Sequence, residues 1–286
     1  MKVISGKDLS TRLKQEMAKE VAGYKIKYGR LPKLSVILVG DDAGSVSYVA
    51  GKAKACEEVG ILNETINYSA IVSETELLEK IKELNGNNSV DGILVQLPLP
   101  KHINENKIIS SIEKNKDVDG FHPLNVAGLW NNTDCILPCT PKGIIKLLKS
   151  ENIAIAGKKA VVIGRSNIVG LPVSKLLLNE NATVTIAHSK TTNLPDVCSQ
   201  ADIIVTAVGR PKFVTPDFIK QGAVVIDVGV NRNPETGKLC GDVDFEASAE
   251  KTSYITKVPG GVGPMTICCL IENTIECFLK NFITNQ

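Results

Sequence analysis

The chain has 286 residues, enough for one large domain or two ordinary ones. Its composition, 43% hydrophobic and 22% charged, is typical of a soluble globular protein. The formal net charge is +2, and neither sign forms a long run, so a nucleic-acid-binding or membrane-surface protein with a basic patch is disfavoured. We therefore expect no nucleic-acid partner.

The N-terminal segment MKVISGKDLS lacks the apolar core of a signal peptide. The longest nearly uncharged stretch, Val258–Ile271, is broken by glycines and prolines and falls short of the roughly 20 apolar residues of a membrane span. A cytoplasmic location without a membrane partner is the expectation. The eight cysteines form no C-x-x-C pair and the three histidines are scattered, which predicts free thiols and no metal site.

In the first half of the chain, apolar β-rich runs alternate with helical patterns, an order typical of a parallel sheet covered by helices. The elements expected, in chain order, are a long helix over Asp8–Tyr28, a buried strand over Leu34–Val39, a helix through Ser47–Ile61, a helix over Glu74–Leu84 and a strand over Gly92–Leu97.

The helix through Ser47–Ile61 carries two lysines that cannot share a face. At about 100° per residue, Lys52 falls on a stripe with Tyr48, Ala55 and Val59, which is otherwise apolar or aromatic. Lys54 lies roughly opposite, where Glu58, four residues on, can pair with it. The pattern predicts that Lys54 is exposed and that Lys52 points inward.

The segment Asn115–Pro141 has the composition of a loop and linker, and a helix begins at its end, around Pro141. The second half repeats the alternation, with strands over Ala160–Ile163, Thr183–Ala187, Ile203–Thr206 and Val224–Val228, a helix over Val169–Leu178 and an apolar helical tail over Met265–Asn281. The fold class predicted is α/β with two domains, each a mostly parallel sheet with helices on both faces, the second Rossmann-like. We place the domains at 1–140, joined by a C-terminal helix over 266–286, and at 141–265.

The stretch Ala160–Pro172 predicts a strand, a tight turn and a helix start that can hold a pyrophosphate on backbone N–H groups. Gly164 permits the turn and Gly170 permits close packing of the helix on the strand. The spacing is G-x-S-x-x-x-G, with Ser166 where the usual fingerprint has a glycine, so the motif alone is weak. An ordinary βα turn is the alternative, but the βαβ context favours a dinucleotide site.

At the end of the next strand, an NAD site usually has an acidic residue for the ribose hydroxyls. This chain has Ser189 and Lys190 there and Arg165 in the preceding turn, donors that suit a 2′-phosphate and indicate NADP. Lys190 could instead be a solvated loop lysine. The ends of two later strands supply the remaining candidates for the nicotinamide half, although simple turn chemistry would also explain them: Thr206, Gly209 and Val230.

Six segments together resemble one family. They are Tyr48-x-x-x-Lys52-x-Lys54, DGILVQLPLP (91–100), KDVDGFHP (116–123), PCTPKG (138–143), GRS-x-x-VG (164–170) and PGGVGPMT (259–266). The chain resembles the bifunctional methylenetetrahydrofolate dehydrogenase/methenyltetrahydrofolate cyclohydrolase family over nearly its whole length. The resemblance implies NADP-dependent oxidation of 5,10-methylenetetrahydrofolate and hydrolysis of the methenyl product to 10-formyltetrahydrofolate, in one cleft between the domains. It also implies a homodimer and a role in one-carbon metabolism and purine biosynthesis.

Carried onto matching positions, the resemblance makes Lys52 the central catalytic residue, mainly for hydrolysis, with Gln96 orienting it. Tyr48 would pack against the aromatic middle of the folate and Asp119 would hold the pterin ring. Gly260, Gly261 and Pro264 would line the folate pocket. Each side chain also has a plainer interpretation, as a core aromatic for Tyr48, a backbone partner for Gln96 and a turn cap for Asp119.

The chemistry is consistent with these roles. Burial on an apolar stripe lowers the pKa of a lysine, which makes a neutral amine available to deprotonate an attacking water. The chain departs from the family pattern at Ala127-Gly128, which puts the conformation of that loop in question, and Gly51 within the helix lacks an evident reason. Two alternatives stay open: a dehydrogenase-only member of the family that uses NAD, and a non-catalytic folate- or nucleotide-binding protein.

Overall fold

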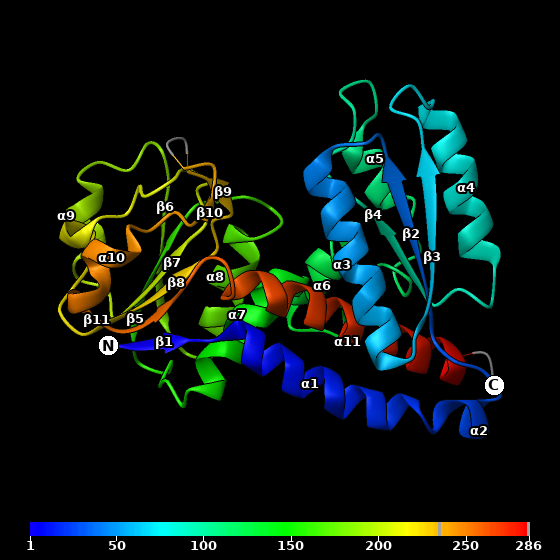
Figure 1. Cartoon of the computed structure of the whole chain (residues 1–286), viewed down its shortest axis with the longest axis horizontal. Helices are drawn as coiled ribbons and strands as arrows, with labels where there is room; N and C mark the ends of the chain where they lie inside the picture. Colours follow the sequence, from blue (N-terminus) through cyan, green and yellow to red (C-terminus); the bar gives the residue numbers. More distant parts are fainter. Residues whose placement is uncertain (234–235, 285–286) are drawn as a thin grey trace. The chain divides into compact units, whose positions relative to one another are not determined.

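The computed structural model describes residues 1–233 and 236–284. The chain forms two compact units (Figure 1), one of Met1–Thr11 with Thr140–Thr266 and the other of Arg12–Cys139 with Ile267–Gln286. We call them the six-stranded unit and the three-stranded unit after their main sheets. Helices α1 (Gly6–Val21) and α11 (Val262–Thr284) each contribute residues to both units.

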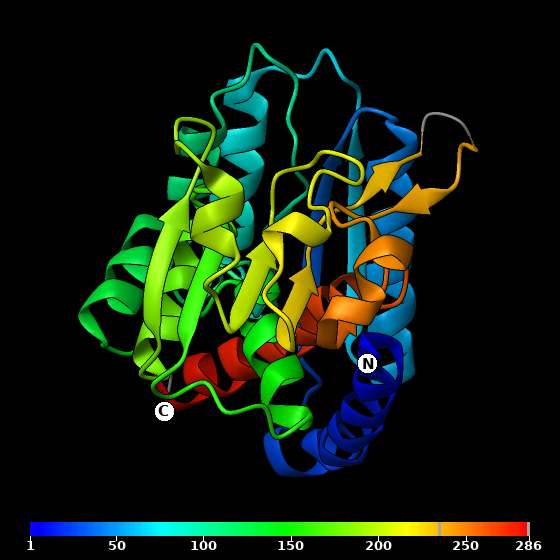
Figure 2. The ribbon, with the colours of Figure 1, turned by 90° about the vertical axis from the view of Figure 1, so that its left-hand side faces the viewer.

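The six-stranded unit is a parallel sheet flanked by helices (Figure 2), as predicted for a Rossmann-like domain. Its strand order is β1 (Lys2–Ile4), β11 (Thr252–Thr256), β8 (Ala223–Asp227), β7 (Ile203–Thr206), β5 (Lys159–Ile163) and β6 (Thr183–Ala187). Its helices are α7 (Cys139–Ser150), α8 (Gly170–Asn179), α9 (Leu194–Cys198) and α10 (Phe245–Ser248), with a β9–β10 ribbon (Asn231–Arg232 and Leu239–Cys240) and short 3₁₀ turns at Pro216–Phe218 and Ala249–Lys251.

Both faces of this sheet are buried. Successive side chains of a strand point to opposite faces, so Val161 and Ile163 of β5 join one core, together with Cys198 of α9. Ala160 and Val162, on the other face, are equally buried. Such two-sided burial explains why the strands of this half read as continuous apolar runs in the sequence.

The three-stranded unit holds the parallel sheet β3 (Leu62–Tyr68), β2 (Lys33–Val39) and β4 (Gly92–Val95). Its other elements are α2 (Tyr24–Tyr28), α3 (Ala43–Val59), α4 (Glu74–Gly86), α5 (Glu105–Ser110) and α6 (Pro123–Asn131). Ile37 and Ile93 face a core built with α4 and α5. On the opposite face, a Cβ on Gly92 would lie 2.5 Å from Val118 Cγ1, so glycine lets the segment around Val118 pack close to the strand.

The structure differs from the predicted elements at several places. The prediction placed residues 1–140 in one domain, whereas Lys2–Ile4 pairs with Tyr254–Thr256 and joins the six-stranded unit. The helix expected over Asp8–Tyr28 breaks at Ala22-Gly23 into α1 and α2. Strand β3 was not predicted because its edge sequence, LNETINY, is largely polar and half-exposed.

Another difference is α6, which occupies the segment expected to be a linker. His122 caps this helix, since its Nδ1 accepts the N–H of Leu124 at 3.1 Å, and Pro123 is the first helical residue. Most of the Asn, Asp, Pro and Gly residues of this segment, which predict one continuous loop, therefore flank a short helix instead.

Helix α11 contains a stretch, Val262–Phe282, that is long and apolar enough to cross a membrane by length and composition. Most of that stretch is buried inside the structure, and the core helix of a soluble protein meets the same test.

A buried lysine, Lys116, caps the carboxyl end of α4 and directly precedes the candidate catalytic loop. Lys116 Nζ donates to the carbonyls of Leu84, Asn85 and Asn87 at 3.1, 2.7 and 2.9 Å. These carbonyls lack helical partners at the end of α4, and a lysine ammonium is a suitable donor for them. The ammonium thereby fixes the backbone that continues into Asp117 and Asp119.

We predict that Lys116→Met lowers the free energy of unfolding by about 2–3 kcal/mol, because it leaves buried carbonyls without donors. Lys114→Met is the matched control, since its Nζ makes one exposed bond to the Asp134 carbonyl, and it should cost less than about 1 kcal/mol. Urea unfolding of both variants measures the difference. Equal losses in the two variants would contradict the capping role.

Candidate active site and nucleotide pocket

Helix α3 places Lys52 inside the three-stranded unit. The helix begins at Asp42, whose Oδ2 accepts the N–H of Ser45 at 2.8 Å. Lys52 is 5% exposed whereas Lys54 is exposed, so the predicted division between the two lysines is confirmed. The predicted partner of Lys54 is wrong: Glu58 pairs instead with Lys14 of α1.

Gln96 binds the buried amine. Lys52 Nζ donates to Gln96 Oε1 at 2.9 Å, and Gln96 Nε2 donates to the carbonyl of Leu97 at 2.7 Å. The second bond fixes the orientation of the amide, so its oxygen faces the lysine. The backbone N–H of Gln96 donates to Ile37 at 2.9 Å, which extends the pairing of β4 with β2 past its last strand residue. Gln96 thus stands at the carboxyl end of a parallel strand, where open α/β sheets bind ligands.

An aromatic ring and a carboxylate accompany this pair. Lys52 Nζ lies 5.4 Å from the centroid of the Tyr48 ring, one helical turn earlier, within the range of a cation–π contact. Asp119 interacts electrostatically with Lys52 from the loop after Lys116. The structure therefore brings together all four side chains predicted to be catalytic: Tyr48, Lys52, Gln96 and Asp119.

The electrostatics of the pair depend on burial. Removal from water lowers the pKa of Lys52, and the charge of Asp119 partly opposes this shift. Burial raises the pKa of Asp119 to about 6, although Lys52 lowers it and Asp117 raises it further. Both ionisations are thus displaced toward neutrality, which is common at catalytic sites.

The Asp119 loop is held by residues that the sequence analysis did not single out. Asp117, nearly fully buried, accepts the N–H of His122 at 2.7 Å and the Asn125 amide at 2.9 Å. Asn125 Oδ1 accepts the N–H of Ile136 at 3.2 Å, and Asn273 of α11 donates to the carbonyl of Val118 at 2.8 Å. The sequence signal for Asp117 was its place in KDVDG, but periodicity cannot show which of two nearby aspartates is structural.

Two of the three glycines near the site have steric reasons. Gly120 has φ +72°, and a Cβ there would lie 2.7 Å from the Ile136 carbonyl oxygen. At the departure from the family pattern, Gly128 lies in α6, where a Cβ would lie 2.6 Å from Cys135 Cβ. The segment is a capped helix, so the departure is accommodated. For Gly51, a Cβ would lie 3.4 Å from Ile267 Cδ1, an ordinary contact distance.

A pocket of about 270 Å³ opens at the carboxyl ends of β5, β6 and β7 in the six-stranded unit. Strand β5 has β6 on one side and β7 on the other, so this edge is the topological switch point where such sheets bind ligands. Its polar lining comes from Arg165, His188, Ser189 and Arg210. No carboxylate is found among the lining residues described for this pocket, which is consistent with an anionic ligand.

The βα turn beside the pocket follows the prediction. Gly164 has φ +126°, and a Cβ there would lie 2.3 Å from the Ala207 carbonyl oxygen. A Cβ on Gly170 would lie 2.3 Å from the Gly164 carbonyl oxygen, so only glycine allows this approach of α8 to the strand end. Ser166 Oγ accepts the N–H groups of Val169 and Gly170 at 3.2 and 3.3 Å, so this serine closes the turn that leads into α8.

The other predicted cofactor residues are placed differently. Lys190 is exposed next to Ser189, and its N–H donates to His188 Nδ1 at 3.2 Å. Thr206 is fully buried, and its hydroxyl donates to Asp227 Oδ1 at 3.3 Å, so its side chain does not reach the pocket. Gly209 has φ +66°, and Val230 is 60% exposed. His188 and Arg210 were missed, because neither position belongs to a recognised nucleotide motif.

The residues predicted to line a folate pocket from the PGGVGP segment belong to the six-stranded unit, whereas Lys52 and its partners belong to the other. Gly260 has φ +106°, and its carbonyl accepts the N–H of Lys7 at 3.0 Å. Gly261 is buried, and a Cβ on Gly6 would lie 1.8 Å from its carbonyl oxygen. Pro264 is half-buried in the first turn of α11.

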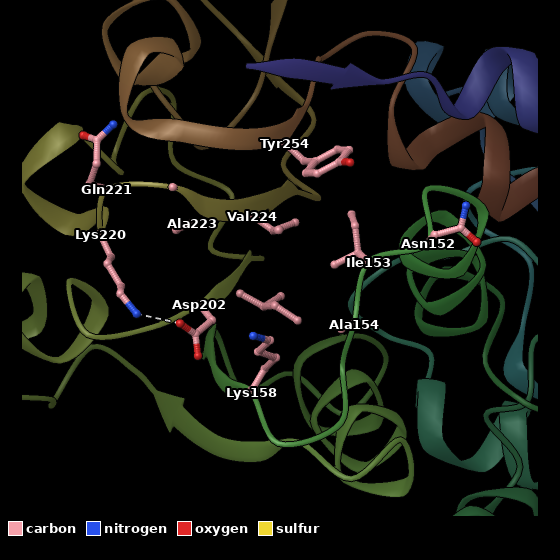
Figure 3. Close-up of a pocket in the computed structure, with 12 residues that line it drawn as sticks. Asn152, Ile153, Ala154, Lys158, Asp202, Lys220, Gln221, Ala223, Val224 and Tyr254 are labelled. Atoms are coloured by element: carbon pink, nitrogen blue, oxygen red, sulfur yellow. Dashed lines mark hydrogen bonds and ion pairs between the residues drawn. The ribbon is translucent and has the colours of Figure 1, made fainter.

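A second pocket lies at the opposite edge of the same sheet (Figure 3), around the amino ends of β7 and β8. Asp202 there accepts from Lys220 Nζ at 2.6 Å and from the N–H of Lys159 at 3.0 Å, so its carboxylate is already paired. Parallel sheets bind ligands at the carboxyl edge instead. In the part of the chain that the structure describes, no group of three or more His, Cys, Asp or Glu side chains could hold a metal.

One unit is Rossmann-like and has a pocket at its topological switch point. The other is an α/β unit with a buried lysine that is hydrogen-bonded to an amide. Together they define the class as a two-unit dinucleotide-dependent enzyme. Two family models match the chain: the tetrahydrofolate dehydrogenase/cyclohydrolase catalytic domain over residues 4–119, and the NAD(P)-binding domain of the same family over residues 138–282. The chain belongs to the tetrahydrofolate dehydrogenase/cyclohydrolase family.

Individual relatives are similar over almost their full length. The bifunctional protein FolD of Bacillus anthracis is 56% identical over 274 residues, which cover 96% of this chain and 95% of that protein. The crystal structure of the bifunctional FolD of Campylobacter jejuni has a TM-score of 0.95 at 49% identity, covering 98% of this chain and 99% of that one. The Trypanosoma brucei FolD, crystallised with NADP and an inhibitor, has a TM-score of 0.93 at 40% identity and 97% coverage of each chain.

We predict that the Asp119 carboxyl titrates near pH 6 and that Lys52→Met raises its pKa further, because the mutation removes the positive charge that lowers it. Carbon-13 NMR of aspartate-labelled protein measures both values. Asp119→Asn assigns the signal, which is needed because burial also raises the pKa of Asp227 to about 6. An Asp119 pKa near 3.8, or one unaffected by Lys52→Met, would contradict this electrostatic coupling.

Proposed function

We propose that this enzyme oxidises 5,10-methylenetetrahydrofolate with NADP⁺ and then hydrolyses the methenyl product to 10-formyltetrahydrofolate, with Lys52 as the base of the second reaction. Membership of a dehydrogenase/cyclohydrolase family supports the pair of reactions. The observation that carries the role of Lys52 is its burial with a 2.9 Å bond to an amide oxygen of fixed orientation.

Hydrolysis requires a base that adds no positive charge beside a cationic substrate. In its neutral form, Lys52 can still donate one N–H to Gln96 Oε1 while its lone pair accepts a proton from water. The water oxygen then bonds to the methenyl carbon as its proton passes to Lys52. The resulting ammonium can return this proton to the ring nitrogen as the carbon–nitrogen bond breaks. The second proton of the water, left on the new hydroxyl, passes to solvent at the same time, which gives the formyl group and restores the free amine.

Asp119 serves a different purpose in this proposal. A carboxyl with a pKa of about 6 is mostly ionised at neutral pH, so it can accept hydrogen bonds from the donor edge of a pterin. Tyr48 offers a half-buried aromatic face for the middle of the folate. We assign Gly260, Gly261 and Pro264 to the same substrate, on the strength of the family resemblance of their segment.

The six-stranded unit has the chemistry to hold NADP, which accepts the hydride when bound. The tight turn at Gly164 and the start of α8 suit a pyrophosphate, since backbone N–H groups and the helix dipole favour anions there. Arg165 and Ser189, which line the pocket, and Lys190, which follows them, suit a 2′-phosphate. The solved Trypanosoma relative was crystallised with NADP, which supports the same choice here.

The alternative of a dehydrogenase-only enzyme using NAD lacks a supporting observation. The four residues proposed for catalysis, Tyr48, Lys52, Gln96 and Asp119, are all present, and no acidic residue is found among the described residues of the nucleotide pocket. An absorbance assay separates the alternatives, with methylenetetrahydrofolate plus NADP⁺ or NAD⁺ in one test and methenyltetrahydrofolate without cofactor in the other. Turnover in neither test would leave a binding protein. The homodimer, the cytoplasmic location and the link to purine biosynthesis stay predictions.

We predict that Lys52→Met reduces the cofactor-free hydrolysis of methenyltetrahydrofolate at least about 100-fold, the usual contribution of a general base, while hydride transfer partly survives. Absorbance assays that follow each reaction separately measure the two rates. Lys54→Met, in the same helix but exposed, is the control and should hydrolyse at the wild-type rate. Undiminished hydrolysis in Lys52→Met would overturn the proposed role.

We predict that Lys190→Ala weakens NADP⁺ by about tenfold and NAD⁺ by less than about twofold, because only NADP⁺ carries the phosphate with which the ammonium would pair. The KM values for the two cofactors measure this. Lys158→Ala, on the opposite edge of the sheet, controls for a general change in charge. An equal loss for both cofactors would remove the argument for 2′-phosphate recognition.

A further inference from the structure

A fully buried carboxylate lies beneath the loop that forms one wall of the nucleotide pocket. Asp242 Oδ2 accepts the N–H groups of Val208 and Gly209 at 2.7 and 3.1 Å, and Oδ1 accepts that of Arg210 at 2.9 Å. Oδ1 also accepts from Asn231 Nδ2 at 2.8 Å. Three consecutive backbone N–H groups therefore converge on one side chain, and Gly209, with φ +66°, allows the bend.

A second carboxylate holds Asp242 in place. Asp227, at the end of β8, accepts the N–H of Asp242 on Oδ1 and that of Val243 on Oδ2, both at 2.9 Å. It also accepts from the N–H of Gly229 and from the Thr206 hydroxyl. The two carboxylates thus join the ends of β7 and β8 to the segment around Asp242 through a continuous set of hydrogen bonds.

The surrounding backbone leaves no space for this arrangement to shift. A Cβ on Gly229 would lie 2.2 Å from Asp242 Oδ1, and a Cβ on Gly241 would lie 1.8 Å from Asp227 Oδ2. Such distances are far below van der Waals contact, so both positions must stay glycine for the carboxylates to remain where they are. This requirement explains two glycines that no nucleotide motif includes.

The loop tied down in this way presents side chains to the pocket. Ala207, Val208 and Arg210 line it, and Phe213 lies beside them. The Arg210 guanidinium sits 4.5 Å from the centroid of the Phe213 ring, a cation–π contact that favours one direction for its charge. The position of this cation therefore depends on the backbone that Asp242 holds.

We propose that Asp242 is a positioning residue for the dinucleotide cofactor: it fixes the 207–210 loop, and with it Arg210, at the wall of the nucleotide pocket. Asp242 itself is 0% exposed, so it acts through the loop and not by direct contact with the cofactor. Because it already accepts the N–H groups of Val208, Gly209 and Arg210, these groups are not available to a phosphate. The 207–210 loop therefore contributes shape and the Arg210 charge to the pocket rather than backbone donors.

This inference rests on the proposed use of NADP, and its test begins with wild-type enzyme that reduces NADP⁺. In Asp242→Asn, an amide NH₂ replaces one oxygen and faces backbone donors, so the loop loses part of its anchor. We expect the KM for NADP⁺ to rise about tenfold or more relative to the KM for methylenetetrahydrofolate. Wild-type enzyme without NADP⁺ reduction would contradict the proposed function instead, so the two failures are distinguishable.

Asp202→Asn is the matched control, because Asp202 also accepts a backbone N–H and a side-chain donor in the same unit but at the opposite edge of the sheet (Figure 3). We expect its KM for NADP⁺ to stay within about twofold of wild type. Asn231→Ala, which removes a single donor to Asp242, should raise the KM for NADP⁺ two- to fivefold, and it decides the question where Asp242→Asn does not fold. An unchanged KM in Asn231→Ala and Asp242→Asn, or an equal rise in Asp202→Asn, would overturn the inference.

Discussion

The proposed chemistry depends on one constraint, the removal of the Lys52 amine from water. An ammonium loses hydration energy on burial, so its pKa falls and its neutral form becomes accessible. A buried amine also needs a hydrogen-bond partner, and Gln96 supplies an oxygen without adding charge. Asp119 moderates the shift from nearby. The surrounding elements serve mainly to hold these three groups in place.

That support is built from polar groups that are themselves buried and satisfied. Lys116 caps the carboxyl end of α4. Asp117 and Asn125 hold the loop that bears Asp119, and Asn273 attaches the same loop to α11. In the six-stranded unit, Asp227 and Asp242 hold the strand ends and the pocket loop in the same manner. In both units, the residues proposed to meet ligands are few, and a second set of buried polar side chains determines the backbone from which they project.

Sequence reasoning reached the sheets and most of their helices because parallel strands buried on both faces leave continuous apolar runs. It also predicted that Lys52 points inward, since helical periodicity reveals a single charged residue on an otherwise apolar face. It did not find β3, whose edge position leaves a polar sequence. It also missed β1 and β11, whose pairing joins residues about 250 positions apart. The roles of Asp117 and Asp242 are likewise invisible in sequence, because they consist of contacts to backbone that only the folded chain brings close.

The central claim, that neutral Lys52 is the base of hydrolysis, is tested most directly by the pH dependence of kcat for cofactor-free hydrolysis of methenyltetrahydrofolate, corrected for the uncatalysed rate. A lysine with a lowered pKa loses its proton as the pH rises, so the rate should climb and level off, with a midpoint below the ordinary lysine value of 10.5. In Asp119→Asn, the midpoint should move to lower pH, because Asp119 raises the pKa of Lys52. A rate that falls with rising pH, or a midpoint that does not move in Asp119→Asn, would contradict the account.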